Sequence, residues 1–389
     1  MMVDGANKEE GTGIEQNSEA MSDDEAVVYE EDDIIQPPME DGEAEVDVED
    51  MSEKTFSQHN GSVFCVAISK SEEYVLTGGE DDLAYVWKIS GEDTFHKIEG
   101  HKDSVSHVGF SANDKYYFTA DLSGYIQLFE FQDNKKIWEF EVGDVLWVMW
   151  HPVVPILLAG AVEGGVWMWK VPAFETKTIQ LSDKPPVDAT FLSTNRHLAV
   201  GYQDGTMKVI DLKTGEATVS VETKREITAI GVSPDDNLVM LGTPHSSVVL
   251  VTVQTGKIIA TLTEHQAGYT APEGAATDSV EHIAFHPKRP VVAVSYVDNK
   301  VCLWDHGLQK LRHTLHHPDG VVKSFWAGDS EHHLVTCCLD GLVRVWDVDQ
   351  NQTIVEVTGH HDQILDMKIS DNLVVTADDS GFVKVFRIA

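Results

Sequence analysis

The feature of this sequence that most limits its fold is a repeat that fills nearly the whole chain. Strand-like segments end in a large apolar residue at spacings of 42, 40, 41, 41, 53, 42 and 40 residues, at Trp87, Phe129, Trp169, Ile210, Val251, Trp304, Trp346 and Phe386. A second marker, the first apolar residue of an upstream strand, recurs in step at Val63, Val105, Val145, Val187, Ile227, Val280, Val321 and Ile364. Units of this length cannot bury their faces alone, so the sequence predicts a closed array of eight stacked units.

The stretch from Leu339 to Asp347 shows what one unit contains. Asp340-Gly341 is a tight-turn pair, and the five residues after it alternate like a strand with one buried face, which indicates a hairpin. With two residues upstream, this hairpin resembles the WD40 repeat, whose unit is a four-stranded antiparallel propeller blade. The resemblance implies hydrogen bonds within the blade among His317, Thr336, Asp340 and Trp346.

The eight units keep this set to different degrees. Unit one has it complete in His59, Thr77, Asp81 and Trp87, as does unit seven. Units two and eight keep the histidine and threonine, with serine at the aspartate position and phenylalanine at the tryptophan position; these residues are His101, Thr119, Ser123, Phe129, His360, Thr376, Ser380 and Phe386. Units three to six lack the histidine, so the sequence predicts complete hydrogen-bonded sets only in units one and seven.

Unit five departs furthest from the pattern. It has His245 at the turn and Val251 at the tryptophan position. A seven-bladed ring with this unit as an extended connection is the alternative, but its full 41-residue length favours a blade. We therefore expect an all-β fold, an eight-bladed WD40 β-propeller.

The chain divides into two parts of different composition. Residues 1–53 hold twenty carboxylates, one lysine and few large apolar groups, so we expect a disordered acidic tail. Residues 54–389 form the propeller. The segment from Lys54 to Gln58 precedes the first blade, whereas unit eight ends after its third strand. We expect the N-terminal segment to supply the missing strand and close the ring without a free sheet edge.

The charge restricts the possible partners. The formal net charge is −37, of which about −19 lies in the tail and −18 on the propeller. Such charge repels nucleic-acid phosphates and anionic lipid and favours a basic protein partner, although it also serves solubility. The sequence shows no secretory signal and no apolar run long enough to span a bilayer, so we expect a monomer in the cytosol or the nucleus.

The recurring histidine, threonine and aspartate do not indicate an enzyme. Each complete set includes a tryptophan and satisfies its own donors, as a structural group does. No metalloprotease, nucleophile-elbow or phosphate-loop motif is present, and we expect neither a cofactor nor a metal. The four cysteines, Cys65, Cys302, Cys337 and Cys338, fall in predicted strands and form no C-x-x-C pair, which is typical of buried residues in a reducing compartment.

Carboxylates at the hairpin turns are the candidate binding residues. Seven of the eight turns carry at least one, and a ring of acids would steer a basic ligand by its negative potential. Four of them, Glu80, Asp82, Asp121 and Asp378, fall outside the expected hydrogen-bonded sets. The candidates for partner binding are Glu80, Asp82, Asp121, Glu163, Asp204, Asp298 and Asp378. An insertion of about twelve residues within 262–279 should lie on the same face and is a further candidate.

Several stretches resemble one family beyond the general repeat. They are 78–82, 100–105, 150–152, 157–160, 167–172, 200–205 and 339–347. Together they are similar to the angio-associated migratory cell protein family, over the whole propeller and with an acidic tail in the same place. That family resembles a fungal WD40 chaperone that escorts a basic large-subunit ribosomal protein, and the resemblance implies this role here. The alternative is a scaffold in cell migration and angiogenesis.

Overall fold

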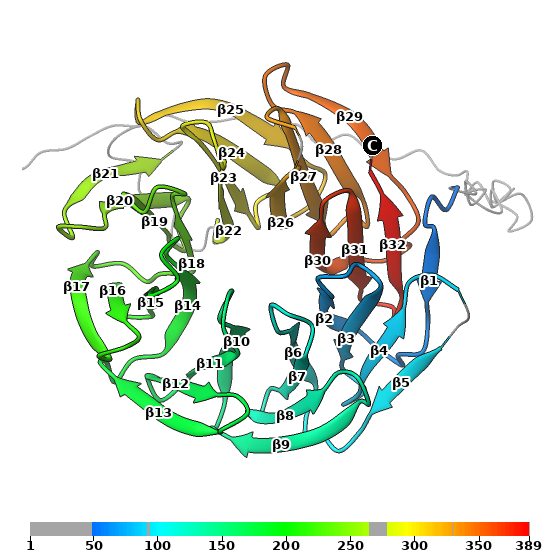
Figure 1. Cartoon of the computed structure of the whole chain (residues 1–389). Helices are drawn as coiled ribbons and strands as arrows, with labels where there is room; N and C mark the ends of the chain where they lie inside the picture. The colour runs from blue at the N-terminus through cyan, green and yellow to red at the C-terminus, as the bar shows by residue number, and fades with distance from the viewer. Residues whose placement is uncertain (1–48, 92–93, 264–277, 329, 389) are drawn as a thin grey trace, which may run out of the picture. The chain divides into compact units, whose positions relative to one another are not determined.

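Eight four-stranded antiparallel sheets are arranged as the blades of a ring in the computed structural model (Figure 1). The structure describes residues 49–91, 94–263, 278–328 and 330–388. Within these ranges there is no helix, and hence no helix long and apolar enough to cross a bilayer. The predicted all-β propeller of eight blades is confirmed.

Each blade is ordered from the channel outward. The innermost strands are β2 (Val63–Ile68), β6 (Val105–Phe110), β10 (Val145–Trp150), β14 (Pro186–Phe191), β18 (Ala229–Val232), β22 (Val280–Phe285), β26 (Val321–Trp326) and β30 (Ile364–Ser370). The second strands are β3 (Tyr74–Gly79), β7 (Tyr116–Asp121), β11 (Ile156–Ala161), β15 (His197–Tyr202), β19 (Leu238–Gly242), β23 (Val291–Tyr296), β27 (His333–Cys338) and β31 (Leu373–Asp378).

The third strands are largely buried, and the outermost strands are the most exposed part of each blade. The third strands are β4 (Ala84–Lys88), β8 (Tyr125–Glu130), β12 (Gly165–Lys170), β16 (Thr206–Asp211), β20 (Ser247–Thr252), β24 (Lys300–Asp305), β28 (Val343–Asp347) and β32 (Val383–Arg387). The outermost strands are β5 (Phe95–Ile98), β9 (Lys135–Glu141), β13 (Glu175–Gln180), β17 (Glu216–Glu222), β21 (Ile258–Thr263), β25 (Lys310–His316), β29 (Gln352–Val357) and β1 (Lys54–Phe56).

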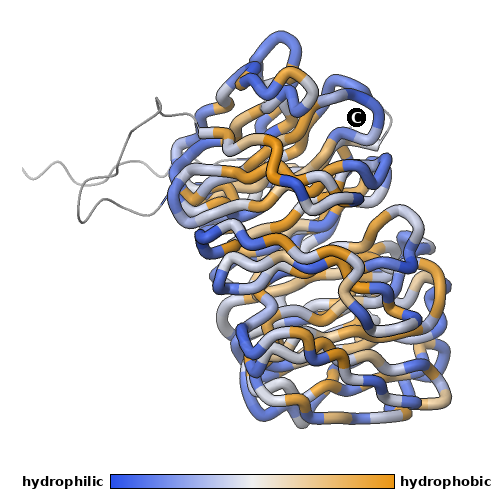
Figure 2. Tube along the Cα trace, turned by 90° about the vertical axis from the view of Figure 1, so that its left-hand side faces the viewer, coloured by the Kyte–Doolittle hydropathy of each residue, from blue (hydrophilic) through white to orange (hydrophobic). Residues whose placement is uncertain are grey.

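The core lies between neighbouring blades rather than within them. Phe118 and Leu128 of blade 2, for example, belong to the same buried cluster as Leu157 and Trp169 of blade 3. Second strands such as β11 are buried along almost their whole length, whereas outermost strands such as β17 are mostly exposed. Figure 2 shows the corresponding pattern, with apolar segments along the strands and hydrophilic turns. Because each blade buries its faces against its neighbours, no blade could be stable alone.

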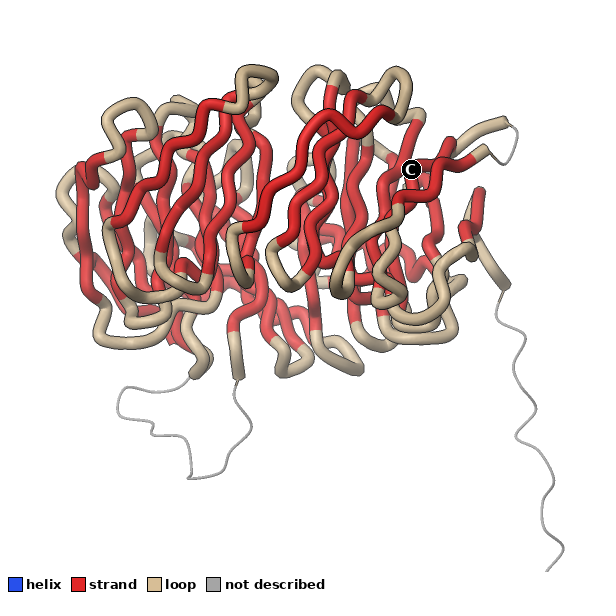
Figure 3. The backbone as a smooth tube through the Cα atoms, turned by 90° about the horizontal axis from the view of Figure 1, so that it is seen from below, coloured by secondary structure: helices blue, strands red, loops and turns tan. Residues whose placement is uncertain are grey.

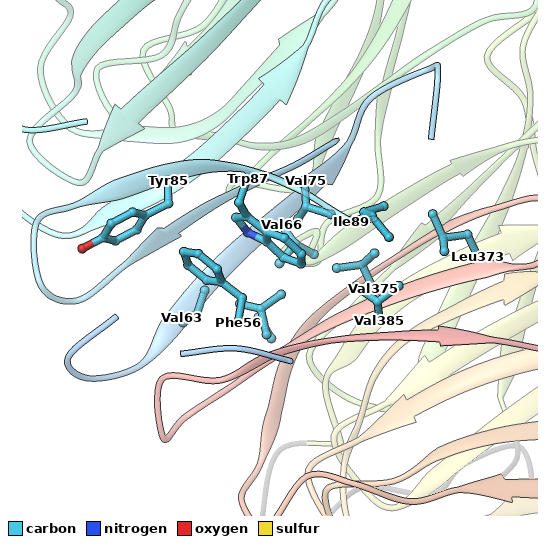
Figure 4. Close-up of a cluster of buried hydrophobic side chains, with 12 residues drawn as sticks. Phe56, Val63, Val66, Val75, Tyr85, Trp87, Ile89, Leu373, Val375 and Val385 are labelled. Carbon is cyan, nitrogen blue, oxygen red and sulfur yellow. The ribbon is translucent and has the colours of Figure 1, made fainter. Parts of the chain in front are cut away.

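The first strand closes the ring. β1 pairs antiparallel with β32, with Lys54 opposite Val385 and Phe56 opposite Val383. The Phe56 ring stacks on Trp87 of blade 1 with the ring centroids 4.9 Å apart and the planes 2° from parallel (Figure 4). This pairing supplies the fourth strand that blade 8 otherwise lacks, so the end of one blade is built from the start of the chain.

Contacts of the N-terminal segment begin before the expected boundary at residue 53. The Glu49 carbonyl accepts a 2.6 Å hydrogen bond from Thr358, and Asp50 forms an ion pair with Lys384. The Glu53 N–H donates to the Val385 carbonyl at 2.8 Å. Within the expected tail, Glu49 and Met51 thus bond to Thr358 of blade 7, and Glu53 continues the pairing of β1 with β32. Residues 1–48 lie outside the described residues.

Unit five is a blade, so the seven-bladed alternative is wrong. Its four strands, β18 to β21, pair in the same order as those of the other blades. Its turn lacks aspartate and is held instead by the Thr243 hydroxyl, which donates a hydrogen bond to the Ser247 carbonyl at 2.9 Å. The expected insertion connects outermost β21 to innermost β22, but its residues 264–277 lie outside the described residues.

Candidate functional site

Each end of the ring carries two sets of connections per blade, and Figure 3 shows the loops gathered at the strand ends. Because the strands are antiparallel, the turns between second and third strands lie at the same end as the connections from each outermost strand to the next innermost strand. Five of the candidate acids are exposed there: Glu80, Asp82, Glu163, Asp204 and Asp298. We call this end, with these acids and those of the outer-to-inner connections, the carboxylate face.

The outer-to-inner connections add acids that the sequence analysis missed. Five exposed acids stand within two residues of the first apolar residue of an inner strand: Asp103, Asp144, Glu226, Asp319 and Asp362. The signal was available in the sequence, because the same apolar residues marked the repeat. These acids lie next to the innermost strands and therefore near the channel, so the carboxylate face carries two rows of negative charge.

The negative charge is uneven around the face. The connection between blades 4 and 5 carries Lys224 and Arg225, both exposed. Lys184, in the connection before it, lies 3.5 Å from Asp183. On the opposite side, the turn of blade 1 carries Glu80 and Asp82 without an ion pair among the described residues. The exposed negative charge is therefore concentrated in the sector around blades 8, 1 and 2.

Asp121 and Asp378, which were candidates for partner binding, are buried. In blade 2, His101 Nδ1 lies 3.2 Å from Asp121 and Nε2 lies 2.8 Å from Thr119. In blade 8, His360 makes 2.6 Å contacts to both Asp378 and Thr376. The two acids are 0% and 1% exposed, so they cannot contact a partner.

The assignment of Ser123 and Ser380 to the aspartate position is accordingly wrong. The aspartate of blades 2 and 8 ends the second strand, two residues after the threonine, and its carboxylate reaches the histidine from there. In blade 1, Asp81 stands four residues after Thr77 and still lies 3.0 Å from His59. Two different turn geometries thus bring a carboxylate to the same place beside the histidine. Counting residues from the pattern of blade 1 therefore selects a serine in blades 2 and 8 instead of the aspartate.

The two sets expected to be complete are each missing one contact. In blade 7, Thr336 accepts from Trp346 Nε1 at 3.0 Å and lies 2.9 Å from His317. Asp340, however, pairs with Arg344 at 2.6 Å and not with the histidine, because that guanidinium is buried and requires a counter-charge. In blade 1, the indole N–H of Trp87 is buried and has no acceptor among the described residues.

The buried turn carboxylates are ionised. Burial acts to raise the pKa of Asp121, but hydrogen bonds from His101, Ser123 and two backbone N–H groups outweigh it and lower the pKa to about 2. The same balance of burial against a histidine hydrogen bond lowers the pKa of Asp81 and Asp378. These three acids hold the turns of blades 1, 2 and 8 in shape and add fixed negative charge beneath the exposed residues.

The channel wall is joined across every seam between blades. A side chain of each innermost strand, or of the residue before it, bonds to the innermost strand of the next blade. The pairs, in ring order, are Cys65–Val105, His107–Leu146, Trp147–Pro186, Asp188–Ile230, Thr228–Val280, His282–Ser324, Lys323–Asp366 and Asp366–Val66. The carboxylate face is therefore mounted on a rigid inner wall.

Three histidines, the buried His317 and the half-buried His107 and His282, make the stability of the ring dependent on pH. Burial lowers the pKa of His107 and His317 to about 4 and that of His282 to about 3. Unfolded histidine titrates near 6.5, so the stability that the neutral rings contribute is complete above that pH and is lost as the pH falls from about 6.5 towards 4. Asp188, whose pKa burial raises to about 6, acts in the opposite direction below pH 6.

We expect the free energy of unfolding to fall between pH 6.5 and 5 by up to about 1.4 kcal/mol per pH unit for each histidine, less the opposing effect of the aspartate. Urea denaturation at pH 7.5, 6.5, 5.5 and 5.0 measures this slope. His317→Asn should reduce the slope, and His316→Asn, at the exposed neighbouring position, should leave it unchanged. A stability that is flat over this range would contradict the expectation.

The part of the chain that the structure describes offers neither a metal site nor a reactive cysteine. No group of three or more histidine, cysteine or acidic residues could hold a metal ion there. The four cysteines are free and buried, and burial raises the pKa of Cys337 and Cys338 to about 12, which keeps their thiols protonated and unreactive. What the face presents is a charged surface for binding.

Known proteins match this chain over most of its length. The profile described as WD domain, G-beta repeat, matches residues 51–88 and 93–130, and the propeller profile described as Nucleolar protein 10-like, N-terminal domain, matches residues 178–387. The human angio-associated migratory cell protein is 35% identical over 351 residues, which are 87% of this chain and 80% of the human protein.

More distant relatives share the fold. The ribosome assembly protein SQT1 of Saccharomyces cerevisiae is 24% identical over 386 residues, 88% of each chain. The crystal structure of Chaetomium thermophilum Sqt1 bound to the N-terminus of the ribosomal protein L10 superposes with a TM-score of 0.77 at 22% identity, over 87% of this chain and 100% of that chain. By its propeller profiles and its identity to the human protein, this chain belongs to the WD40 β-propeller family of the angio-associated migratory cell protein.

Proposed function

We propose that this protein is an escort for a basic large-subunit ribosomal protein and binds the N-terminal segment of an L10-type protein on the carboxylate face. The observation that carries the proposal is the double row of exposed acids on that face. Support comes from the ribosome assembly protein SQT1 and from the Sqt1 structure bound to the L10 N-terminus, both of which share this fold. Because ribosomal proteins are synthesised in the cytosol, the proposed activity belongs there, and it involves no catalysis.

The proposed contact residues lie in the sector of highest negative charge. Glu80 and Asp82 project from the turn of blade 1, and Asp103 and Asp362 from the connections that lead into blades 2 and 8. Glu163, Asp204 and Asp298 extend the row to blades 3, 4 and 6. Asp121 and Asp378 are not part of the contact set, because their carboxylates are buried.

Neutralising four acids of the face should weaken binding without unfolding the ring. The test variant is Glu80→Gln, Asp82→Asn, Asp103→Asn and Asp362→Asn. Asparagine is chosen at position 82 because that residue has a φ of 59°, which asparagine tolerates. Calorimetric titration with the L10 N-terminal peptide should show a loss of about tenfold, since each exposed ion pair contributes roughly 0.2–1 kcal/mol. The wild-type affinity should also fall with added salt.

The matched control neutralises four exposed acids at the opposite end of the strands: Glu73→Gln, Asp133→Asn, Glu175→Gln and Glu216→Gln. Its affinity should equal that of the wild type. An equal loss in both variants would show that net charge alone attracts the peptide. Absence of binding by the wild-type chain, with purification from cells yielding cytoskeletal partners instead, would reject the escort function in favour of a scaffold in cell migration, the activity to which the human relative's name refers.

A further inference from the structure

One turn position recurs at the mouth of the channel. The first residue after the second strand donates its backbone N–H to a carbonyl just before the innermost strand, over 2.8–3.0 Å. We call it the rim position. In blades 1 to 4 and 6 to 8 it is occupied by Glu80, Leu122, Val162, Gln203, Val297, Leu339 and Asp379. The shared hydrogen bond places these residues at equivalent points around the face. The type of side chain at each rim position therefore decides which chemical groups surround the mouth of the channel.

The rim is divided into acidic and apolar sectors. Blades 8 and 1 carry the acids Asp379 and Glu80, and the next two blades carry Leu122 and Val162. Leu122 is 45% exposed and Val162 is 38% exposed, although both have neighbours among the most buried residues of the ring. Single exposed apolar side chains need no explanation, but two at one repeated position on adjacent blades form a small apolar surface.

Hydrogen bonds join the acidic sector to the apolar one. The Ser62 hydroxyl donates to Asp379 at 2.6 Å and lies 3.3 Å from the Glu80 carboxylate, so the two acids converge on one serine. The Glu80 carbonyl accepts from the Ser104 hydroxyl at 3.4 Å, and the Ser104 carbonyl accepts from the Leu122 N–H at 3.0 Å. The carboxylate pair and the apolar surface are thus neighbours fixed to one backbone framework.

We propose that this arc is a two-part subsite for a client segment in which a basic residue is followed closely by a bulky apolar residue. The cation binds between Glu80 and Asp379, and the apolar side chain packs on Leu122 and Val162. The inference rests on the proposed function, because it assumes that the client is basic. It adds that the client segment also needs a bulky apolar residue close to the basic one. Charge complementarity selects the cation, and burial of exposed apolar surface selects its neighbour.

Phe64 supports this chemistry from the channel side. It lies in innermost strand β2, at the point where the pairing with β3 skips a residue between Val63 and Cys65. The skipped residue is 36% exposed, whereas Val63 and Cys65 are buried. An exposed phenylalanine in the same blade as Glu80 gives a client side chain a second apolar surface at the mouth.

The test separates the apolar contribution from the charged one. The variant Leu122→Asn with Val162→Asn keeps every charge of the face. Its matched control is Leu308→Asn with Val153→Asn, two apolar residues that are 71% and 62% exposed in turns at the opposite end of the strands. Two probes are titrated into each protein: the L10 N-terminal peptide, and the same peptide with its aromatic and aliphatic side chains replaced by serine.

The rim variant should bind the unmodified peptide about tenfold more weakly than the wild type, and the control variant should bind it equally well. For the serine-substituted peptide the rim variant and the wild type should not differ, because the partner group is already absent. The loss should persist in 0.5 M salt, where the charged contribution is screened.

Two outcomes would overturn the inference and remain distinguishable from each other. If the rim variant binds like the wild type while the charge-neutralised variant binds weakly, the apolar subsite is rejected and the escort function stands. If the wild type binds neither peptide, both the subsite and the proposed function are rejected. Thermal unfolding of each variant establishes that the ring is intact, since these substitutions lie in exposed turns.

Discussion

Removal of residues 1–56 will lower the midpoint of thermal unfolding by about 10 °C or more, whereas removal of residues 1–48 will leave it unchanged. The longer deletion takes away β1, exposes the edge of β32 and leaves the Trp87 ring without the Phe56 ring that stacks on it. Truncating a buried phenylalanine alone costs about 3–5 kcal/mol. The shorter deletion spares every described contact of the segment, which begin at Glu49.

Two full-length controls locate the effect. Phe56→Ala should reproduce a large part of the loss, because the side chain is 7% exposed and belongs to the cluster between blades 8 and 1. Thr55→Ala, in the same strand but with an exposed side chain, should change the midpoint little. Differential scanning calorimetry of the four proteins provides the comparison, and equal midpoints for the two truncations would show that β1 does not hold the ring closed.

The second large effect is expected from Asp121→Ala. This carboxylate accepts hydrogen bonds from the Ser123 hydroxyl at 2.7 Å and from the N–H groups of Lys102 and Tyr125 at 2.9 Å, in addition to its contact with His101. Its loss leaves the buried His101 ring and these partly buried donors unpaired, which typically costs about 3–5 kcal/mol. Chemical denaturation of Glu163→Ala, an exposed turn acid in the next blade, should show a change within about 0.5 kcal/mol.

The change of stability at acid pH tests the same assignment, because the pKa of Asp121 fixes its direction. The folded pKa of Asp121 lies near 2, below its unfolded value of about 3.9. Its contribution to stability is therefore complete above pH 4 and is lost as the pH falls towards 2. Asp121→Ala should remove that part of the acid dependence. If Glu163→Ala destabilised the ring as much as Asp121→Ala, the assignment of Asp121 to a buried structural role would be wrong.

The repeat made the architecture predictable, because every blade needs a similar pattern of apolar residues in its strands. Even blade 5, with Val251 where others have tryptophan, keeps the apolar pattern that packs it between its neighbours, and so it could be counted. The point at which the N-terminal segment joins the ring was harder to predict. Nothing in the composition of residues 49–53 distinguishes them from the acidic residues before them, and only the pairing with β32 and the contact with Thr358 set them apart.

Which turn acids are exposed could not be predicted from the sequence. Aspartate is favoured in turns for backbone reasons as well as for binding, and the sequence does not say which way its side chain points. Asp82 and Asp121 were equally good candidates, yet one is exposed and the other is fully buried against a histidine. The two hairpins are equally long, with Thr77 opposite Tyr85 and Thr119 opposite Gln127, so the difference depends on the path of the turn backbone, which is a three-dimensional property.

The pairing of β1 with β32 also dictates when this protein can become active. Phe56 and Val383, which face each other in the finished ring, are separated by more than 300 residues of chain. At typical synthesis rates of 5–20 residues per second, the first strand waits roughly 15–65 s for its partner to be made. Blades 1 to 7 can assemble in order during that interval, but the last seam forms only after the final strand has left the ribosome. A protein that escorts newly made chains would therefore have to finish its own synthesis before its ring is complete.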